Sequence, residues 1–117
     1  MPEYDLRKRT KSFALRIIRM VSALPGTMVA QTLGKQVLRS GTSVGSNYRE
    51  AYRARSGAEF IAKMGDCLRE LDETVYWLDL LIESETVPAE KLVALADETD
   101  QLTAIFTTIV KKKKGNT

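Results

Sequence analysis

The sequence contains no histidine and only one cysteine, Cys67, among its 117 residues. The missing histidine excludes a di-iron site of the four-helix type, which needs Glu-x-x-His pairs, and leaves any nucleophile without a histidine base. A single cysteine cannot form an internal disulfide or, alone, a thiolate metal site. Cys67 falls in an apolar row of a predicted helix, so we interpret it as a small core residue. We therefore expect no enzymatic activity, no catalytic residue, no cofactor and no metal.

Long apolar runs are also missing. The best candidate, Trp77 to Ile82, is interrupted by Asp79 and is far shorter than the ~20 residues needed to cross a bilayer. The first residues carry acids and then bases, without the apolar region of a secretory signal. We therefore expect a cytoplasmic protein that does not insert into a membrane.

The composition is that of a folded domain. A chain of 117 residues that is 44% hydrophobic fits one domain with one core, over residues 1–117. The four consecutive lysines at 111–114 favour a solubilising, frayed tail over residues 111–117, which would also attract phosphate backbones.

Apolar residues recur at alternating intervals of three and four along the whole chain, which predicts four helices and no strand. Pro25-Gly26 ends the first helix, and Ser56 opens the third as the N-cap of a capping box with Glu59. The predicted helices span residues 6–24, residues 27–55, a third stretch from 56 to the break at 83–86, and a fourth after Pro88. Because the connections are short, we expect an all-α, antiparallel up-down-up-down four-helix bundle.

The second predicted helix holds an unusual run of small and polar residues, R-S-G-T-S-V-G-S-N-Y-R-E-A from Arg39 to Ala51. These are poor helix formers, and two interior glycines cost about 2 kcal/mol in a helix. Val37, Val44 and Tyr48 nevertheless keep their helical phase across the run. We therefore predict that the helix continues through residues 40–47 and that packing offsets the cost.

This run resembles the 23S rRNA intervening-sequence proteins, which are small bacterial four-helix bundles, as do S-G-A-E-F-I and C-L-R-E-L-D-E-T-V-Y-W-L-D-L-L. The resemblance covers almost the whole chain and is densest from Arg39 to Leu81. It implies no established enzymatic activity and a closed homo-oligomeric ring, typically a pentamer. A more distant relative, the accessory protein of diversity-generating retroelements, resembles a pentameric barrel that engages nucleic acid and a reverse transcriptase. By analogy, the expected partners are the chain itself and RNA, DNA or a nucleic-acid-processing protein.

Charge is distributed unevenly along the sequence. Residues 1–65 hold twelve Lys or Arg against four Asp or Glu, and residues 66–100 hold two against eleven, so the two regions carry +8 and −9. One interpretation is that the basic and acidic helices complement each other within the domain or between subunits. The other is that the basic face binds an anionic partner.

Two groups of residues in the second helix are candidates for specific roles. Tyr48 and Tyr52 alternate with arginines, and guanidinium and aromatic groups together recognise phosphates and single-stranded bases. The candidate binding residues are Arg39, Arg49, Arg53 and Arg55. Alternatively, these arginines pair with the acids of the last two helices. The second group, Ser43, Asn47 and Glu50, is predicted to form a partly buried polar network that fixes helix register.

The third helix carries two large aromatic residues beside its apolar stripe. Trp77 flanks the stripe and Tyr76 points away from it. Aromatic residues at such positions are typical of protein–protein contacts, so we expect both at an interface between subunits. The alternative is that a neighbouring helix covers Trp77 and that Tyr76 is an ordinary surface residue.

Overall fold

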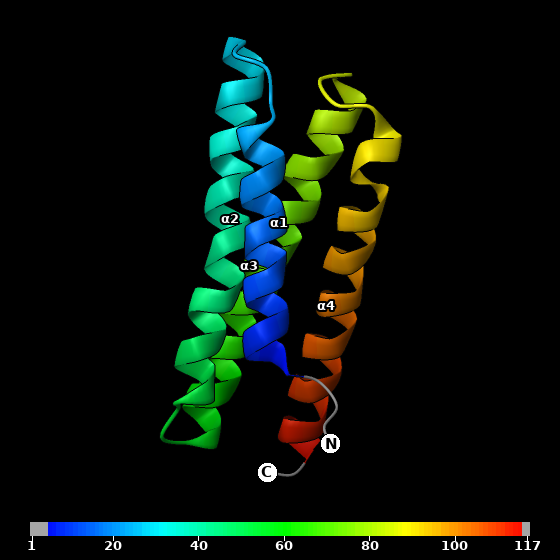
Figure 1. Ribbon diagram of the computed structural model, residues 1–117. Helices are drawn as coiled ribbons and strands as arrows, with labels where there is room; N and C mark the ends of the chain where they lie inside the picture. Colours follow the sequence, from blue (N-terminus) through cyan, green and yellow to red (C-terminus); the bar gives the residue numbers. More distant parts are fainter. Residues whose placement is uncertain (1–4, 116–117) are drawn as a thin grey trace.

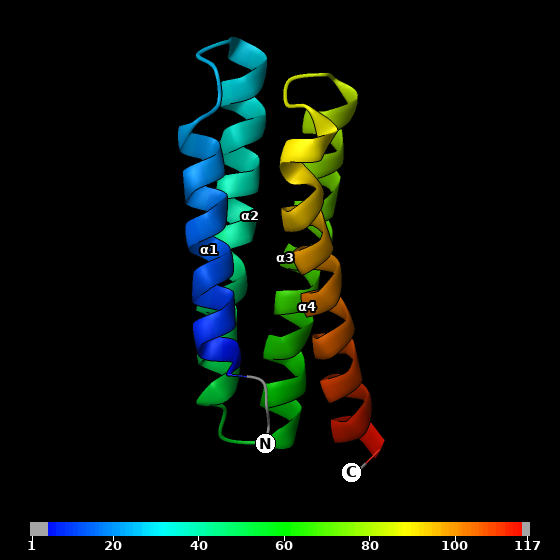
Figure 2. The ribbon, with the colours of Figure 1, turned by 45° about the vertical axis from the view of Figure 1, so that its right-hand side comes forward.

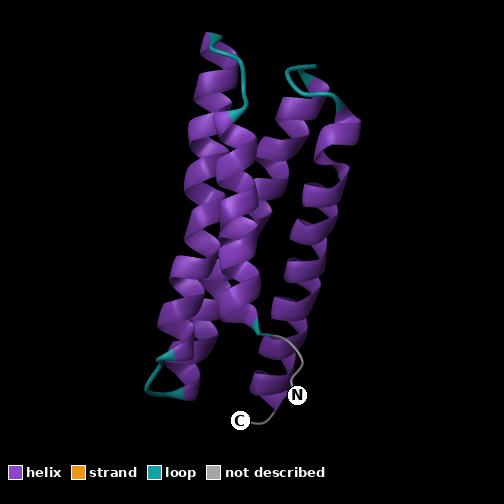
Figure 3. Ribbon diagram, in the orientation of Figure 1, coloured by secondary structure: helices purple, strands orange, loops and turns teal. Residues whose placement is uncertain are grey.

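The computed structural model describes residues 5–115 and consists of four helices joined by short turns (Figure 1). The helices are α1 (Leu6–Ser22), α2 (Met28–Tyr52), α3 (Gly57–Glu83) and α4 (Ala89–Gly115). Each runs antiparallel to the one before it, and α1 begins at the end of the bundle where α4 finishes (Figures 1 and 2). No strand occurs between residues 5 and 115 (Figure 3). The predicted all-α four-helix bundle is confirmed.

Side chains of polar residues cap the starts of three helices. The Asp5 carboxylate accepts a hydrogen bond from the Lys8 amide, and the Thr27 hydroxyl accepts one from Ala30. The Ser56 hydroxyl accepts from the Glu59 amide at 3.0 Å, which confirms the predicted N-cap of α3. These bonds satisfy amides that have no partner within their own helix.

One apolar core runs the length of the bundle, which measures 48 × 21 × 20 Å. All four helices contribute fully buried side chains, the largest of which are Phe13, Ile17, Met64, Leu71, Leu78, Leu81, Leu92, Leu102 and Phe106. Half-buried residues on both flanks of α3, among them Leu68 and Trp77, pack against this core. The wide apolar stripe of α3 therefore lies against both α2 and α4.

Helix α2 continues through residues 40–47, as predicted. The glycines of this run face α1: a Cβ added to Gly41 would lie 2.7 Å from Ile17 Cγ1, and one added to Gly45 would lie 3.1 Å from Thr10 Oγ1. A Cβ at Gly41 would therefore clash with α1, and one at Gly45 would make an unusually tight contact, so both glycines favour the close approach of the two helices. The resulting packing offsets their poor helix propensity.

The predicted frayed tail is wrong up to Gly115, because α4 continues through the four lysines. Lysine is a good helix former, and positive charge near a helix C-terminus is favourable to the helix dipole. The Lys113 ammonium also lies 5.9 Å from the centre of the Phe60 ring of α3. The last two residues of the predicted tail, 116–117, lie outside the described part of the chain.

The predicted network of Ser43, Asn47 and Glu50 is also wrong. Ser43 donates to the Arg39 carbonyl of its own helix at 2.6 Å, because a serine hydroxyl in a helix can be satisfied locally. Glu50 is exposed and pairs with Lys63 of α3 at 2.6 Å. No hydrogen bond within residues 5–115 joins these three side chains to one another.

The buried polar contact between α2 and α3 is made by other residues. The Ser40 and Thr74 hydroxyls lie 2.8 Å apart, and both residues are fully buried. Thr74 also lies 2.8 Å from the Glu70 carbonyl oxygen, to which it donates. Since a hydroxyl has one proton, Ser40 is the donor to Thr74.

Candidate nucleic-acid interface

An open hollow of about 270 Å³ lies between the start of α1 and the end of α2. Its lining consists of five cationic side chains, one carboxylate and one aromatic ring: Arg7, Lys8, Lys11, Arg49, Arg53, Asp5 and Tyr52. The antiparallel arrangement of α1 and α2 brings these two segments together (Figure 2). The helical repeat brings residues three and four apart to the same side of each helix, such as Lys8 and Lys11 or Arg49 and Arg53.

The five cations of the hollow form no ion pair within residues 5–115. Elsewhere in the bundle, basic and acidic side chains meet. Arg39 lies 3.1 Å from Glu73, and Arg9 lies 2.8 Å from Glu98. The hollow is therefore a place where positive charge gathers without compensation, apart from the single carboxylate of Asp5.

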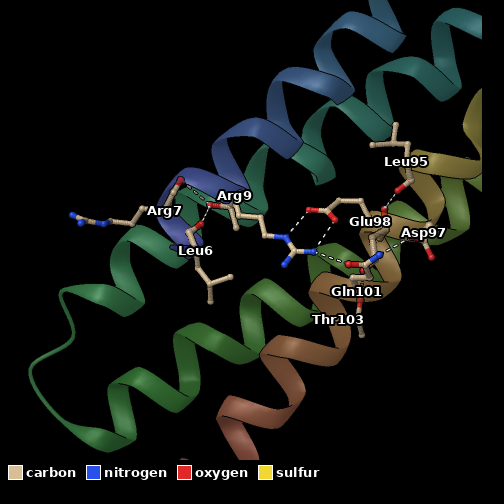
Figure 4. Close-up of polar contacts among 10 residues, drawn as sticks. Leu6, Arg7, Arg9, Leu95, Asp97, Glu98, Gln101 and Thr103 are labelled. Atoms are coloured by element: carbon tan, nitrogen blue, oxygen red, sulfur yellow. Dashed lines mark hydrogen bonds and ion pairs between the residues drawn. The ribbon is translucent and has the colours of Figure 1, made fainter. Parts of the chain in front are cut away.

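The Arg9–Glu98 contact is an example of a cation whose charge is neutralised by a carboxylate of another helix (Figure 4). Two nitrogens of Arg9 donate to the two Glu98 oxygens at 2.8 and 2.9 Å, and Arg9 also donates to Gln101. The hydrogen bond from Arg9 lowers the pKa of the Glu98 carboxyl from its usual value. This contact joins α1 to α4.

Tyr52 provides an aromatic surface inside the hollow. Its side chain remains exposed, with 56% of the residue surface open to solvent. The guanidinium carbon of Arg7 lies 4.4 Å from the centre of the Tyr52 ring, a cation–π distance. Tyr48, the other candidate aromatic residue, instead packs inward against Phe106, with ring centres 5.7 Å apart.

A second hollow of about 220 Å³ extends the first along the seam between α1 and α2. The two hollows share Arg7, Lys11 and Arg49, and the second continues to Ala14, Thr42, Gly45 and Ser46. Together they form a groove, which we call the basic groove. Its α1 side, from Arg7 to Ala14, is about 10 Å long at 1.5 Å per residue.

The structure brings only two of the four predicted binding arginines together. Arg49 and Arg53 line the basic groove, whereas Arg39 lies on the other side of α2 against α3, and Arg55 is exposed in the turn before α3. Sequence reasoning missed the α1 contribution of Arg7, Lys8 and Lys11. The dense basic run of residues 7–11 was the available signal, but a helix pairing must be known before it can be assigned to this site.

The groups most relevant to catalysis are potential metal ligands and side chains with a shifted pKa. Between residues 5 and 115, no three potential metal ligands converge. Burial raises the pKa of the Cys67 thiol to about 12, so this thiol stays protonated at neutral pH and is a poor nucleophile. Burial also raises the pKa of Glu70, with Glu73 adding to the effect. None of the four helices is sufficiently long and apolar to span a bilayer over this part of the chain.

The two aromatic residues predicted at a subunit interface differ in exposure. Tyr76 is exposed, and Trp77 is half-buried against the core. Their rings meet edge to face with centres 5.0 Å apart. The indole nitrogen of Trp77 is buried and has no hydrogen-bond partner among residues 5–115.

The fold and the groove define a four-helix bundle with a basic groove between α1 and α2. The family model for the 23S rRNA-intervening sequence protein matches residues 3–108, so the chain belongs to this family. A solved protein of unknown function from the S23 ribosomal protein family of Bacteroides thetaiotaomicron is 36% identical, over 90% of this chain and 94% of that chain. The two structures superpose with a TM-score of 0.84. Among curated proteins the comparison finds no match.

Proposed function

We propose that this protein binds nucleic acid through the basic groove and performs no chemistry on it. One observation carries the proposal: five cations gather around one hollow without any ion pair among residues 5–115, whereas Arg9, Arg39 and Lys63 each pair with a carboxylate. Such a surface attracts polyanions, and arginine forks match the geometry of phosphate oxygens.

A salt titration tests this proposal. Binding of labelled single-stranded RNA, single-stranded DNA and duplex is measured from low to high ionic strength. Each phosphate neutralised contributes about 0.7 to 0.9 to the slope of log affinity against log salt. The double variant Arg49→Ala/Arg53→Ala is expected to weaken binding and reduce this slope. The matched control is Arg39→Ala, which removes an arginine of the same helix that already pairs with Glu73.

The proposal fails if none of the three nucleic acids binds at low ionic strength. It also fails if Arg39→Ala weakens binding as much as the double variant does, because the effect would then reflect overall charge and not the groove.

A second candidate function is a protein-interaction scaffold without a nucleic-acid role. It is favoured by the ion pairs Arg9–Glu98 and Arg39–Glu73, in which the basic and acidic helices already complement each other within one chain. The same complementarity between subunits would use the groove for assembly. In that case Arg49→Ala/Arg53→Ala lowers the assembly state and leaves any weak nucleic-acid binding unchanged.

We further propose that the protein forms a closed homo-oligomer, a pentamer by family resemblance, with Tyr76 and Trp77 at or near the contact. Exposure of the Tyr76 ring next to the half-buried Trp77 supports this placement. Because Trp77 also packs on the core, Tyr76→Ala is the cleaner test. Light scattering at tens of micromolar protein should show an oligomer that this change weakens. A monomeric wild-type protein would contradict the assembly.

A further inference from the structure

We propose that the basic groove takes single-stranded nucleic acid, with a base stacked on Tyr52 and adjacent phosphates held by Arg49, Arg53 and Lys11. This inference rests on the proposed function, and it adds a strand type and a base-contacting residue. The reason is the combination of cations and an exposed aromatic ring within one hollow, where phosphate attraction alone would need only the cations.

The position of Tyr52 suits stacking. The ring belongs to the last residue of α2. It lies among charged side chains, and 56% of the residue surface is open to solvent. An isolated exposed tyrosine would be unremarkable. Here Arg49 and Arg53 line the same hollow as the ring, so a strand that contacts these arginines lies next to Tyr52.

Two neighbours contact the Tyr52 ring, and more than half of the residue surface stays exposed beside them. Arg7 covers one side of Tyr52 at 4.4 Å, and its guanidinium is itself a flat group on which bases stack. Tyr48 is tilted by 48° with its ring centre 6.3 Å away, so it does not stack on Tyr52 in parallel. Tyr52 and Arg7 therefore form a preassembled aromatic and cationic surface.

Strand type follows from base accessibility. In a duplex the base faces are covered by neighbouring bases, so a duplex can offer its phosphates to the groove but cannot place a base on Tyr52 without flipping it out. A single strand offers both phosphates and base faces. The groove continues from the Tyr52 hollow past Lys11 and Arg49 to Ser46, which gives a flexible strand a path along the seam.

The test compares three probes of equal length: a labelled oligothymidine strand, the same backbone without bases, and a duplex. Tyr52→Leu removes the ring and keeps an apolar side chain, and Tyr52→Phe is the matched control that keeps the ring. Since Tyr52 is exposed, both variants should keep the wild-type circular dichroism and melting behaviour, which is measured first.

The expected result is that Tyr52→Leu weakens oligothymidine binding by about 5- to 150-fold, the range that corresponds to stacking of one base. Binding of the abasic strand and of the duplex should be unchanged, and Tyr52→Phe should bind like the wild type. Equal losses on oligothymidine and abasic strand would overturn the inference, because Tyr52 would then only position Arg7.

Two further outcomes separate this inference from the proposed function. If wild-type protein binds duplex or abasic strand as tightly as oligothymidine, the groove binds phosphates without reading single strands, and only the inference fails. If no probe binds at low salt while an acidic peptide does, the proposed function fails with it.

Discussion

Helix α2 packs against α1 along one seam and against α3 along another. The two seams differ in the hydrogen bonds and ion pairs that their polar side chains form. In the α2–α3 seam two polar contacts join the helices: Ser40 bonds to Thr74, and Arg39 pairs with Glu73. In the α1–α2 seam, glycines bring the backbones close, and the cations at its open end form no ion pair among residues 5–115.

The contrast shows that the role of an arginine on α2 is set by the helix that it faces. Arg39 faces the acidic α3 and pairs with Glu73, whereas Arg49 and Arg53 face the start of α1, where the N-cap Asp5 is the single carboxylate that lines the hollow. The α2–α3 seam therefore serves to hold helices together, and the α1–α2 seam leaves positive charge available for a ligand. The following predictions test this division, from the largest effect to the smallest.

Charge reversal in the seam between α1 and α2 should have the largest effect on nucleic-acid affinity. Arg49→Glu/Arg53→Glu is expected to lower nucleic-acid affinity by about 100-fold or more at low salt, because two charged hydrogen bonds to phosphate are lost and two repulsive charges are added. Anisotropy titration with a labelled single strand measures this loss. Thermal stability should remain near wild type, because both arginines lie at the surface without ion pairs in residues 5–115.

The control for this experiment is Arg39→Glu in the seam between α2 and α3. It places a second carboxylate beside Glu73 and should lower thermal stability while affecting affinity less. If both variants reduce affinity equally, the two seams do not differ in the way proposed.

Glycine replacement tests the close approach of α1 and α2. Gly41→Ala places a Cβ 2.7 Å from Ile17 Cγ1, and Ile17 is fully buried and has little freedom to move. Gly65→Ala in α3 is the matched control, because nothing lies within 4 Å of its added Cβ. Both changes gain about 1 kcal/mol of helix propensity. Gly41→Ala should therefore be less stable than Gly65→Ala by about 1–3 kcal/mol, the usual penalty of overpacking, as measured by urea unfolding.

A double-mutant cycle tests the partnered polar groups of the α2–α3 seam. Thr74→Val removes the acceptor of the buried Ser40 hydroxyl, whose remaining neighbour, the Val37 carbonyl oxygen, is 3.4 Å away. A buried donor left without a good partner should cost about 1–3 kcal/mol of unfolding free energy. Adding Ser40→Ala should restore part of this loss. Strictly additive losses would show that the two hydroxyls do not depend on each other.

The fold was predictable because its signals are local. The three-and-four spacing, Pro25-Gly26 and the Ser56 cap depend on residues close in sequence, and α1, α2 and α3 begin or end within a few residues of these signals. The error at Lys111–Lys114 arose because charge was taken to indicate fraying, while helix propensity and the dipole favour continuation.

The site was less predictable because it depends on which helices face each other. The sequence shows Arg39, Arg49 and Arg53 on one helix, but helix period alone does not tell which of them meets an acid on α3 and which meets α1. The prediction of a polar network of Ser43, Asn47 and Glu50 was wrong for a similar reason. Ser40 and Ser43 belong to the same run of small residues, and the sequence does not tell which of them faces α3. Only the orientation of α2 places Ser40 against Thr74.

The smallest effect is expected at the Arg9–Glu98 contact, which joins the basic and acidic halves. Arg9 lowers the pKa of Glu98 in the folded protein, so the pair stabilises the fold above the ordinary glutamate pKa of about 4.3. This stabilisation is lost as pH falls through the lowered pKa. At neutral pH, Glu98→Gln should cost about 1 kcal/mol or less, because both side chains keep some exposure. Melting curves of both proteins from pH 7 to pH 3 should converge at the acid end, because protonated Glu98 then resembles glutamine. A difference that persists at pH 3 would mean that packing, and not charge, accounts for the role of Glu98.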